Sequence, residues 1–393
     1  MKVKVIRTST IPISLNKLLK GQLKFLSKDF DVIGLSSSGK DLKEVNEREG
    51  VRTIALEMQR GISPVKDFIS LIQLYKVFVK EKPHIVHSIT PKAGLLSMLA
   101  AKLAGVPIRM HMFTGLLFPT KKGISQKIFI KMDQLLCWAA TNIYPEGNGV
   151  KQDLINYNIT SKPLKVLANG NVNGIDLDFF APEQVSENQK LKLKQNLNIT
   201  ADDFVFVFVG RLVGDKGINE LVEAFKSFDN TIVKLLLVGP LELKQDPIKE
   251  TTLKEIENNN NIISVGSQSD VRPYLAISDV LVFPSYREGF PNVVLQAGAM
   301  ELPSIVTNIS GCNEIIEEGK NGIIIPPRDK NAIFNAMNFV IQNEQKRAFF
   351  KKNSRQMIKS RYEQQVVWDA ISEEYNVLIR DLNNKITKPN ANN

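Results

Sequence analysis

Residues 204–217 read FVFVFVGRLVGDKG, an uninterrupted apolar run followed by a turn that carries two cations. Continuous apolar runs of this length are typical of parallel strands that helices cover on both faces. A helical pattern begins near Ile218, so the stretch predicts a strand, a loop and a helix in succession. This succession is the repeating unit of an α/β fold.

The same alternation extends in both directions from this stretch, on either side of a Gly- and Asn-rich segment at 168–178. The expected strands are 3–7, 31–35, 51–56, 84–88, 108–113, 204–209, 233–238, 262–265, 280–283, 304–306 and 322–325. We therefore predict an α/β protein with two doubly wound parallel sheets, arranged as two Rossmann-like domains that face each other across a cleft.

The domain boundaries follow from this alternation. Residues 1–170 are expected to form the first domain and residues 171–360 the second, with the linker near 169–183. A helical pattern at 361–383 is expected to pack back on the first domain, and the polar tail 384–393 is predicted to be disordered. Ligands of open parallel sheets bind at the carboxyl ends of the strands, so function is expected in the loops that follow them.

Composition excludes several classes of protein. The chain has 393 residues, of which 43% are hydrophobic and 23% charged, as in ordinary globular proteins. Its two cysteines, Cys137 and Cys312, form no disulfide framework or zinc spacing and predict a reducing cytoplasm. The N-terminus reads as a strand rather than a signal peptide. The most apolar stretch, 93–118, is broken by charges, so no membrane-spanning helix is expected.

Charge is distributed unevenly along the chain. Residues 1–170 contain 26 Lys and Arg against 12 Asp and Glu, whereas the whole chain has a net charge of +10. This excess predicts an anionic partner for the first half, namely nucleic acid, lipid headgroups or a phosphate-bearing substrate. A role in solubility alone is the alternative.

The turn after the 204–209 strand carries groups suited to phosphate. Arg211 can bind phosphate oxygens through two hydrogen bonds, and Lys216 adds a point charge. Gly210 and Gly217 allow a phosphate to approach the backbone near a helix N-terminus. An ordinary charged surface turn is the alternative for this segment taken alone.

Residues 282–300, VFPSYREGFPNVVLQAGAM, predict a second strand, loop and helix. Pro291 suits the first helical turn, which leaves the amides of Asn292 and the next residue to face an anion or a sugar hydroxyl. Glu288, at the carboxyl end of the strand, is placed to accept hydrogen bonds from sugar hydroxyls. Gln296 lies about two turns into the helix and can reach a neighbouring part of the same ligand.

Together these segments resemble the donor half of family 4 retaining glycosyltransferases, which have the GT-B fold. The resemblance rests on Gly210, Arg211, Leu212, Lys216 and Gly217, on 284–300, and on LPSIVTNISGCNEII at 302–316. The first half is similar to the branch that builds bacterial capsule, O-antigen and exopolysaccharide repeat units. That likeness is carried by SLNKLLKG at 14–21, by 47–67, by 85–120 and by YPEGNGV at 144–150.

The resemblance implies a role for each matching residue. Arg211 and Lys216 are expected to hold the donor diphosphate, while Glu288 and the backbone of the following residues contact the transferred sugar. Those following residues are Gly289, Phe290, Pro291 and Asn292. Relatives carry a second glutamate, which binds the nucleotide ribose, where this chain has Gln296. An amide accepts a hydrogen bond less strongly than a carboxylate, so weaker nucleotide binding is expected.

The expected chemistry needs no protein nucleophile. Charge develops on the leaving diphosphate, and fixed cations with helix N-terminal amides stabilise it. The resemblance implies a front-face reaction in which a phosphate oxygen takes the proton of the acceptor. No Asp-x-Asp pair lies near these motifs, so no metal and no other cofactor are expected.

Four residues of the first half are candidate contacts in the cleft. His87 and His111 lie near expected strand ends, where they either hydrogen-bond a sugar or serve a structural role. Lys92, at a helix start, either meets an acceptor phosphate or is solvated. Thr114 stands where many relatives carry a histidine. A metal pair of His84 and His87 is disfavoured because their spacing places them on opposite faces of a strand.

A helix in the first half has the composition of a membrane-surface helix. Lysines flank an apolar stripe there, which predicts contact with an anionic membrane surface. The residues are Lys121, Lys122, Lys127 and Lys131, with Ile124, Ile128, Ile130, Met132 and Leu135.

Three other interpretations fit less well. Residues 34–41, GLSSSGKD, nearly match a phosphate-binding P-loop, but Asp41 stands where a magnesium-binding Ser or Thr is needed. The first expected strand of each half is followed by residues 8–14 and 210–217, and neither segment has the Gly-x-Gly-x-x-Gly of a dinucleotide dehydrogenase. A nucleic-acid-binding protein explains the basic half but leaves Arg211, Lys216 and Glu288 without a purpose.

The sequence therefore predicts a cytoplasmic retaining glycosyltransferase, peripheral on the inner face of the plasma membrane. It would move a hexosyl or N-acetylhexosaminyl group from a nucleotide sugar, expected to be UDP-linked, to a polyprenyl-diphosphate-linked saccharide. A soluble sugar or another lipid is the alternative acceptor. No nucleic acid is expected as a partner.

Overall fold

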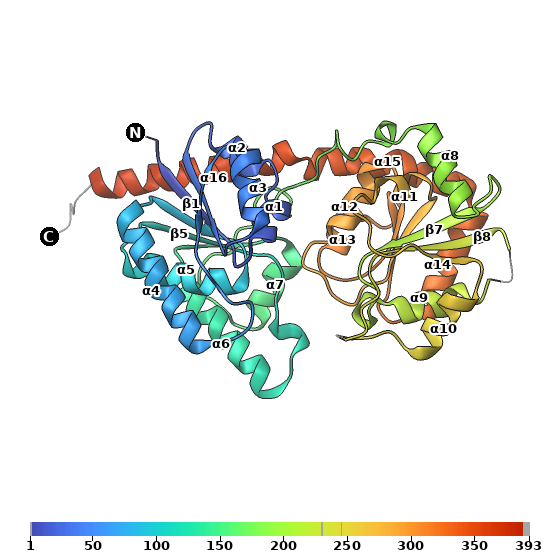
Figure 1. The fold of residues 1–393 in the computed structure, drawn as a ribbon, viewed down its shortest axis with the longest axis horizontal. Coiled ribbons are helices and arrows are strands. Elements are labelled where there is room, and N and C mark those ends of the chain that lie inside the picture. Colours follow the sequence, from blue (N-terminus) through green and yellow to red (C-terminus); the bar gives the residue numbers. More distant parts are fainter. Residues whose placement is uncertain (1, 229–230, 245, 388–393) are drawn as a thin grey trace. The chain divides into compact units, whose positions relative to one another are not determined.

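The computed structural model describes residues 2–228, 231–244 and 246–387, which divide into two compact units. Unit 1 comprises the chain up to Gly174 together with the residues from Gln364 onward, and unit 2 spans Ile175–Glu363 (Figure 1). The divisions fall after Gly174 and Glu363, a few residues beyond the predicted positions 170 and 360.

Unit 1 contains a six-stranded, all-parallel sheet in the order β3-β2-β1-β4-β5-β6. Its strands are β1 (Lys4–Thr8), β2 (Asp31–Ser36), β3 (Arg52–Ala55), β4 (Ile85–Ser88), β5 (Ile108–Phe113) and β6 (Asn142–Pro145). Its helices are α1 (Pro12–Leu18), α2 (Gln22–Leu26), α3 (Lys40–Glu49), α4 (Pro64–Glu81), α5 (Pro91–Leu103), η1 (Phe118–Thr120), α6 (Gly123–Ala139), α7 (Asn148–Asn156) and α16 (Gln364–Thr387). β6 is not among the strands predicted from the sequence, because its four residues begin with Asn142 and end with Pro145.

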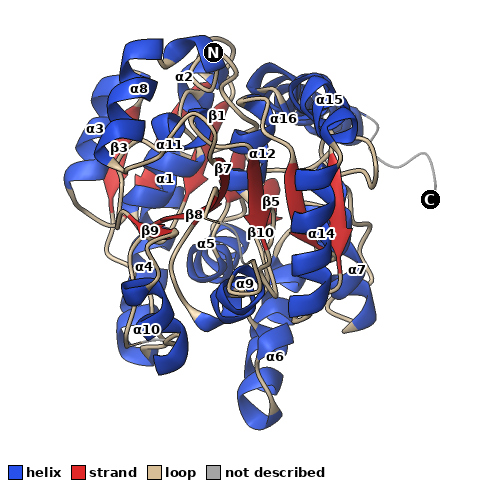
Figure 2. Cartoon of the chain, turned by 90° about the vertical axis from the view of Figure 1, so that its right-hand side faces the viewer, coloured by secondary structure: helices blue, strands red, loops and turns tan. Residues whose placement is uncertain are grey.

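The strands of unit 1 divide its core into two layers. Successive side chains of a strand point to opposite faces, so Val5 belongs to one apolar cluster and Ile6 to the other. The Val5 layer contains residues of α1, α2, α3 and α16, whereas the Ile6 layer contains residues of α4, α5 and α6. Helices therefore cover both faces of the sheet, as the continuous apolar strands require (Figure 2).

Helix α16 packs on unit 1 although it lies at the far end of the chain. Val367, Ile371 and Tyr375 are spaced at one helical turn and are fully buried in the Val5 layer. The helix continues to Thr387, so disorder from residue 384 onward is wrong for the first residues of the predicted tail. The sequence has no Gly or Pro there before Pro389, so nothing interrupts the helix. Residues 388–393 of the predicted tail lie outside the described residues.

Unit 2 repeats the same strand order, β12-β11-β10-β7-β8-β9, in a second six-stranded parallel sheet. Its strands are β7 (Phe204–Val209), β8 (Val233–Val238), β9 (Ile262–Ser264), β10 (Val280–Phe283), β11 (Ser304–Thr307) and β12 (Gly322–Ile325). Its helices are η2 (Pro182–Gln184), α8 (Glu187–Asn196), η3 (Gly214–Lys216), α9 (Ile218–Phe225), α10 (Glu250–Asn258), α11 (Arg272–Ala276), α12 (Asn292–Ala299), α13 (Cys312–Ile315), α14 (Lys330–Gln342) and α15 (Glu344–Tyr362). Both sheets are thus doubly wound, and the chain has the predicted α/β class.

A buried arginine holds α16 to the centre of the first sheet. Arg7 is fully buried on β1, and its Nη1 donates a hydrogen bond to the Tyr375 hydroxyl at 3.0 Å. The Nε and Nη2 atoms of Arg7 have no hydrogen-bond partner among the described residues. Tyr375 also lies 2.7 Å from Nδ1 of His87. Because a buried cation is costly when it loses a hydrogen-bond acceptor, this single hydroxyl is important for stability.

We expect Tyr375→Phe to lower the free energy of unfolding of unit 1 by about 1–3 kcal/mol, the usual cost of leaving a buried polar group unsatisfied. Chemical denaturation followed by circular dichroism measures this change. Tyr157→Phe is the control because Tyr157 is 36% exposed, and a surface change of this kind stays within about 0.5 kcal/mol. Equal stability of the two variants would contradict the role given to Tyr375.

Candidate active site

Two loops of unit 2 meet at the carboxyl ends of adjacent strands. β7 and β10 are neighbours in the sheet, although β8 and β9 separate them in sequence. After β7 the chain builds the sheet outward on one side, through β8 and β9, and after β10 it builds the sheet on the other side, through β11 and β12. The position between β7 and β10 is therefore the topological switch point, where open α/β sheets bind ligands. The loop at 210–217 follows β7 and the loop at 284–291 follows β10, as the sequence predicts. A hydrogen bond of 2.8 Å from the Tyr286 amide to the Asp215 carbonyl joins the loops.

Glycines allow these loops to approach closely. Gly217 has a φ of +71°, and a Cβ there would overlap the carbonyl oxygen of Pro284 in the neighbouring loop. Gly311, with a φ of +76°, begins α13 after β11, and its Cβ would lie 2.5 Å from the Gly289 carbonyl oxygen. Left-handed backbone of this kind favours glycine, and neither position has room for a side chain. The loops after β7, β10 and β11 are therefore packed backbone against backbone.

This packing brings Lys216 and Glu288 into an ion pair. The Lys216 Nζ contacts Glu288 Oε1, and the two side chains are only 17% and 15% exposed. The Ser285 hydroxyl donates a hydrogen bond of 2.7 Å to the same carboxylate oxygen. The Lys216 ammonium also lies 5.6 Å from the centre of the Phe283 ring. Two of the predicted functional residues thus form one partly buried, charged centre at the switch point.

Arg211 belongs to the same loop but is more exposed. Its side chain is 50% exposed and donates a hydrogen bond of 2.7 Å to Glu242. Gly210, with a φ of +154°, precedes it at the end of β7. An exposed ion pair of this kind contributes little to stability, so Arg211 can exchange its partner at small cost.

The predicted residues after Glu288 differ in what they offer a ligand. The Phe290 ring is buried and lies 5.4 Å from the Tyr362 ring, so only the backbone of Phe290 can serve a ligand. Pro291 is the N-cap of α12 rather than its first helical residue, and the helix begins at the exposed Asn292. Gln296 is partly buried about one turn into α12, not two turns as expected, because the helix begins only at Asn292. The helix still starts beside Glu288, which places its first amides at the same edge of the sheet.

Ser285, Tyr286 and Cys312 also lie around this centre, and none was predicted from the sequence. Burial raises the pKa of Tyr286, and the Arg328 guanidinium lies 4.6 Å from its ring centre. Cys312 is fully buried, and burial raises the pKa of its thiol well above the usual value, with the Glu288 charge adding to the shift. The thiol therefore stays protonated and is no nucleophile. The position of Ser285, between a strand end and Glu288, is the signal that could have indicated it.

The four candidates of unit 1 have structural partners. His87 is fully buried on the α16 face against Tyr375, and His111 is buried on the opposite face, 2.7 Å from the Ser88 hydroxyl. Burial lowers the pKa of His87 well below its usual value and that of His111 to about 3, so both rings are neutral. The structure therefore favours the structural role left open for these histidines, because strand alternation turns both rings into the core.

Lys92 and Thr114 are also engaged within unit 1. The Lys92 side chain is 8% exposed and forms an ion pair with Asp67 of α4, so of the two alternatives left open for it, a solvated lysine is wrong. The Thr114 hydroxyl donates a hydrogen bond of 2.8 Å to the Ile89 carbonyl. Neither side chain is directed at a ligand by these contacts.

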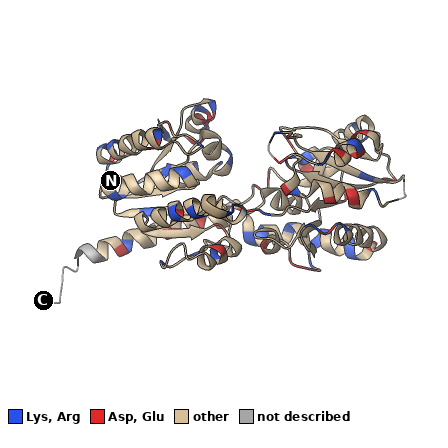
Figure 3. Cartoon of the chain, turned by 90° about the horizontal axis from the view of Figure 1, so that it is seen from below, with Lys and Arg blue, Asp and Glu red and all other residues tan. Residues whose placement is uncertain are grey.

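Two helices of unit 1 expose apolar side chains. On α6 these are Ile124, Ile128, Leu135 and Trp138, accompanied by exposed Lys127 and Lys131. Ile130 and Met132 of the predicted stripe are instead partly buried. On α4 a second stripe, missed in the sequence because such a pattern usually faces a core, comprises Val65, Phe68, Ile69, Ile72, Tyr75 and Val79. Lysines and arginines lie on the helices of unit 1 (Figure 3).

Two kinds of site are not found in the described residues. They contain no group of three His, Cys, Asp or Glu side chains that could hold a metal ion. None of the helices among them combines the length and apolarity needed to cross a bilayer.

The two Rossmann-type sheets, with the loop pair at the switch point of unit 2, define a glycosyltransferase of the GT-B class. Residues 189–357 match the family model described as glycosyl transferases group 1, and residues 15–146 match the model described as glycosyl transferase 4-like. The chain belongs to this glycosyltransferase family, as the resemblance of its motifs predicted.

Curated relatives and solved structures agree with this assignment. The chain is 34% identical over 373 residues to the capsular polysaccharide biosynthesis glycosyltransferase CapM of Staphylococcus aureus, which covers 94% of this chain and 96% of CapM. It is 33% identical over 282 residues, 71% of each chain, to an Escherichia coli enzyme named UDP-Gal:alpha-D-GlcNAc-diphosphoundecaprenol alpha-1,3-galactosyltransferase. A glycosyltransferase from Rickettsia africae has the same fold, with a TM-score of 0.82, 19% identity, and coverage of 96% of this chain and 99% of that one. HepE of Anabaena, solved with UDP, has a TM-score of 0.77 at 19% identity, covering 96% and 100%.

The close approach at Gly217 can be tested against a glycine that lacks it. Gly266 has a similar φ of +67°, but a Cβ there would meet nothing within 4 Å. Gly266→Ala should therefore cost only the backbone strain of about 1–2 kcal/mol. Gly217→Ala should cost more, because the Pro284 loop must also move away. Denaturant unfolding measures both, and an equal loss in the two variants would show that the loops are not tightly packed.

Proposed function

We propose that this protein is a retaining glycosyltransferase that moves a hexosyl or N-acetylhexosaminyl group from a UDP-sugar to a polyprenyl-diphosphate-linked saccharide. The observation that carries the proposal is the Lys216–Glu288 pair at the switch point of unit 2. A cation for a diphosphate and an acceptor for sugar hydroxyls lie side by side there. The E. coli relative is named for a UDP-galactose donor and a diphosphoundecaprenol-linked acceptor, and HepE was solved with UDP-glucose, which supports this choice of substrates.

Each residue of the centre has a proposed role. Lys216 and Arg211 bind the donor diphosphate, and the first amides of α12 add hydrogen-bond donors and the positive end of the helix dipole. Glu288 accepts hydrogen bonds from the transferred sugar, with Ser285 holding its carboxylate in place. Gln296 accepts a hydrogen bond from the ribose. Glu288 balances the charge of Lys216 before the donor binds, so the lysine can be kept partly buried.

The transfer breaks the bond between the anomeric carbon and the diphosphate oxygen and forms a bond from that carbon to the acceptor oxygen. The proton of the acceptor hydroxyl passes to an oxygen of the leaving diphosphate, on the same face of the sugar, so the configuration is retained. Lys216, Arg211 and the helix amides stabilise the charge that develops on the diphosphate. The protonated, buried Cys312 thiol offers no nucleophile for an alternative two-step route.

Unit 1 is proposed to bind the acceptor and to rest on the inner face of the plasma membrane. The exposed apolar side chains and lysines of α6 suit an anionic lipid surface, and the stripe of α4 enlarges the apolar area. Exposed lysines Lys66, Lys76 and Lys80 accompany that stripe. A lipid-linked acceptor would be presented at such a surface.

Removing either cation should cut the rate of sugar transfer. Lys216→Ala and Arg211→Ala are each expected to lower kcat by about 100-fold or more, as for loss of one transition-state donor. A radiolabelled UDP-sugar assay with lipid-linked acceptor measures this. Lys226→Ala is the matched control because Lys226 is 66% exposed and forms a surface pair with Glu255. Near-normal turnover of the two site variants, with folding intact, would contradict the proposal.

Transfer should also be independent of divalent metal, because fixed cations and helix amides neutralise the diphosphate in this proposal. The initial rate after dialysis against EDTA is expected to equal the rate with added Mg²⁺ or Mn²⁺. A rate that disappears with EDTA and returns with metal would show that the assigned residues are not sufficient.

Membrane contact predicts co-sedimentation with phosphatidylglycerol vesicles at low salt, weakened by high salt because the lysine contribution is screened. Ile124→Asp should reduce this binding, since Ile124 is 79% exposed on α6. Phosphatidylcholine vesicles serve as the uncharged comparison. A protein that stays in the supernatant with anionic vesicles would favour a soluble acceptor.

A further inference from the structure

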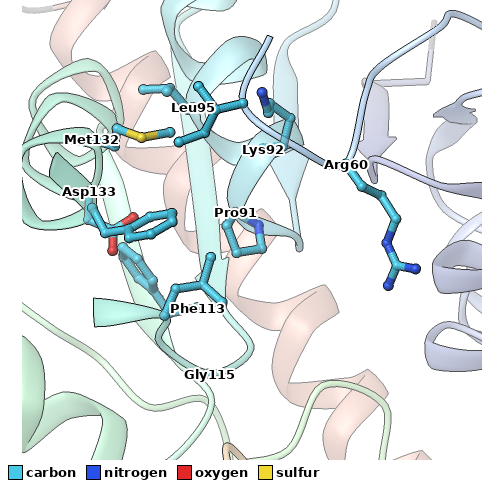
Figure 4. Close-up of a pocket in the computed structure, with 11 residues that line it drawn as sticks. Arg60, Pro91, Lys92, Leu95, Phe113, Gly115, Met132 and Asp133 are labelled. Carbon is cyan, nitrogen blue, oxygen red and sulfur yellow. The ribbon is translucent and has the colours of Figure 1, made fainter. Parts of the chain in front are cut away.

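A pocket lies at the carboxyl edge of the sheet in unit 1. The empty space inside and in front of it, open solvent included, is about 540 Å³, and its lining comes from unit 1 alone (Figure 4). Three of the contributing segments follow β3, β4 and β5: the loop with Ile62, the start of α5 at Pro91, and the turn with Leu117. The fourth is the inner side of α6. The pocket therefore occupies the carboxyl end of the sheet, where open parallel sheets bind ligands.

The interior of this pocket is apolar. Leu95, Phe113, Phe129 and Met132 line it, and Figure 4 shows Met132 beside Asp133. Burial raises the pKa of the Asp133 carboxyl to about 7, far above its usual value, so these surroundings solvate charge poorly. Such a lining suits a hydrocarbon better than a sugar or a nucleotide.

The apolar lining continues to the surface of the protein. Ile62 and Leu117, which line the pocket, are 59% and 42% exposed. Just beyond Ile62, α4 begins with its outward stripe at Val65, which is 74% exposed. A hydrocarbon chain in the pocket can thus pass to the exposed apolar helices without crossing a polar rim at these residues.

The charges of the pocket fit an anionic head group outside it. Lys92 lines the pocket but is already neutralised by Asp67. Arg60 is exposed, has no ion-pair partner among the described residues, and points away from the apolar lining in Figure 4. A ligand with an apolar tail and a phosphate therefore has a place for each part.

We propose that this pocket binds the phosphate-proximal isoprenoid segment of the lipid carrier, with the phosphate held outside the apolar lining near Arg60. The inference rests on the proposed function, because it names the part of the acceptor that unit 1 recognises. It assigns Leu117 and Ile62 to acceptor binding, a role that does not involve the donor loops of unit 2. The acyl chain of a membrane phospholipid has similar chemistry and is the other occupant to be tested.

Calorimetric titration with geranyl phosphate, a short water-soluble isoprenoid phosphate, tests the assignment. We expect saturable binding by the full-length protein, and no binding of inorganic phosphate at the same concentration. Leu117→Asp and Ile62→Asp should each weaken geranyl phosphate binding by about tenfold or more, since they place a charge beside the hydrocarbon. Both side chains are exposed, so these variants should fold. Dihexanoyl phosphatidylglycerol should not displace geranyl phosphate.

Leu103→Asp is the matched control, because Leu103 is 68% exposed at the opposite end of α5 from the pocket residues Pro91 and Leu95. It should leave geranyl phosphate binding unchanged. The proposal is overturned by equal binding in all three variants, by inorganic phosphate binding as tightly, or by displacement with the phospholipid.

A separate UDP titration tells this failure from failure of the proposed function. UDP binding that depends on Lys216 and is unaffected by Leu117→Asp would leave the transferase proposal intact even if the pocket assignment failed. Loss of both would remove the proposed function together with the pocket.

Discussion

The close backbone approach of three loops at the carboxyl edge of the second sheet is the constraint on which the site depends. Gly217 lies against the Pro284 carbonyl, and Gly311 lies against the Gly289 carbonyl, with no room for a Cβ at either place. Because neither contact leaves space for a side chain, the loops after β7, β10 and β11 have one compact arrangement. Lys216 is carried by the first of these loops and Glu288 by the second. The packing of the loop backbones therefore brings the two residues close enough to form their ion pair.

The charge balance of that pair explains how Lys216 can stay partly buried before an anionic ligand binds. A lone ammonium at 17% exposure would be costly, and Glu288 compensates it with a charge that Ser285 also holds by a hydrogen bond. A diphosphate can replace the carboxylate as the partner of Lys216, while the carboxylate turns to neutral sugar hydroxyls. Arg211, exposed and paired only at the surface with Glu242, adds a second cation at small cost. The pocket of unit 1 is lined mainly by apolar side chains, and its Lys92 is paired with Asp67, so the two units offer different chemistry.

The parts of the fold that were predicted correctly are those set by local sequence. The continuous apolar run of β7 identifies a doubly covered strand, and the turn expected after it lies at the end of that strand. Features set by contacts between distant residues were not predictable in this way. His87 faces Tyr375 from α16, which a single sequence does not pair with β4, so its structural role remained one of two alternatives. The outward stripe of α4 has the period of a core-facing helix, and only the packing of its other face on α5 shows which side is exposed. β6 has only four residues and ends with a proline, so its sequence is not distinguished from that of a loop.

Calorimetric titration of the purified protein with UDP and with GDP, in the absence of metal, tests whether the switch-point loops of unit 2 form the donor site. We expect saturable binding of UDP alone, with binding lost in Lys216→Ala and retained in Lys226→Ala. We also expect weakened binding in Glu288→Gln when the ligand is the UDP-sugar and little change when it is UDP, since Glu288 is assigned to the sugar. UDP binding that is indifferent to Lys216, or absent from a folded protein, would contradict the assignment of the switch-point loops as the donor site.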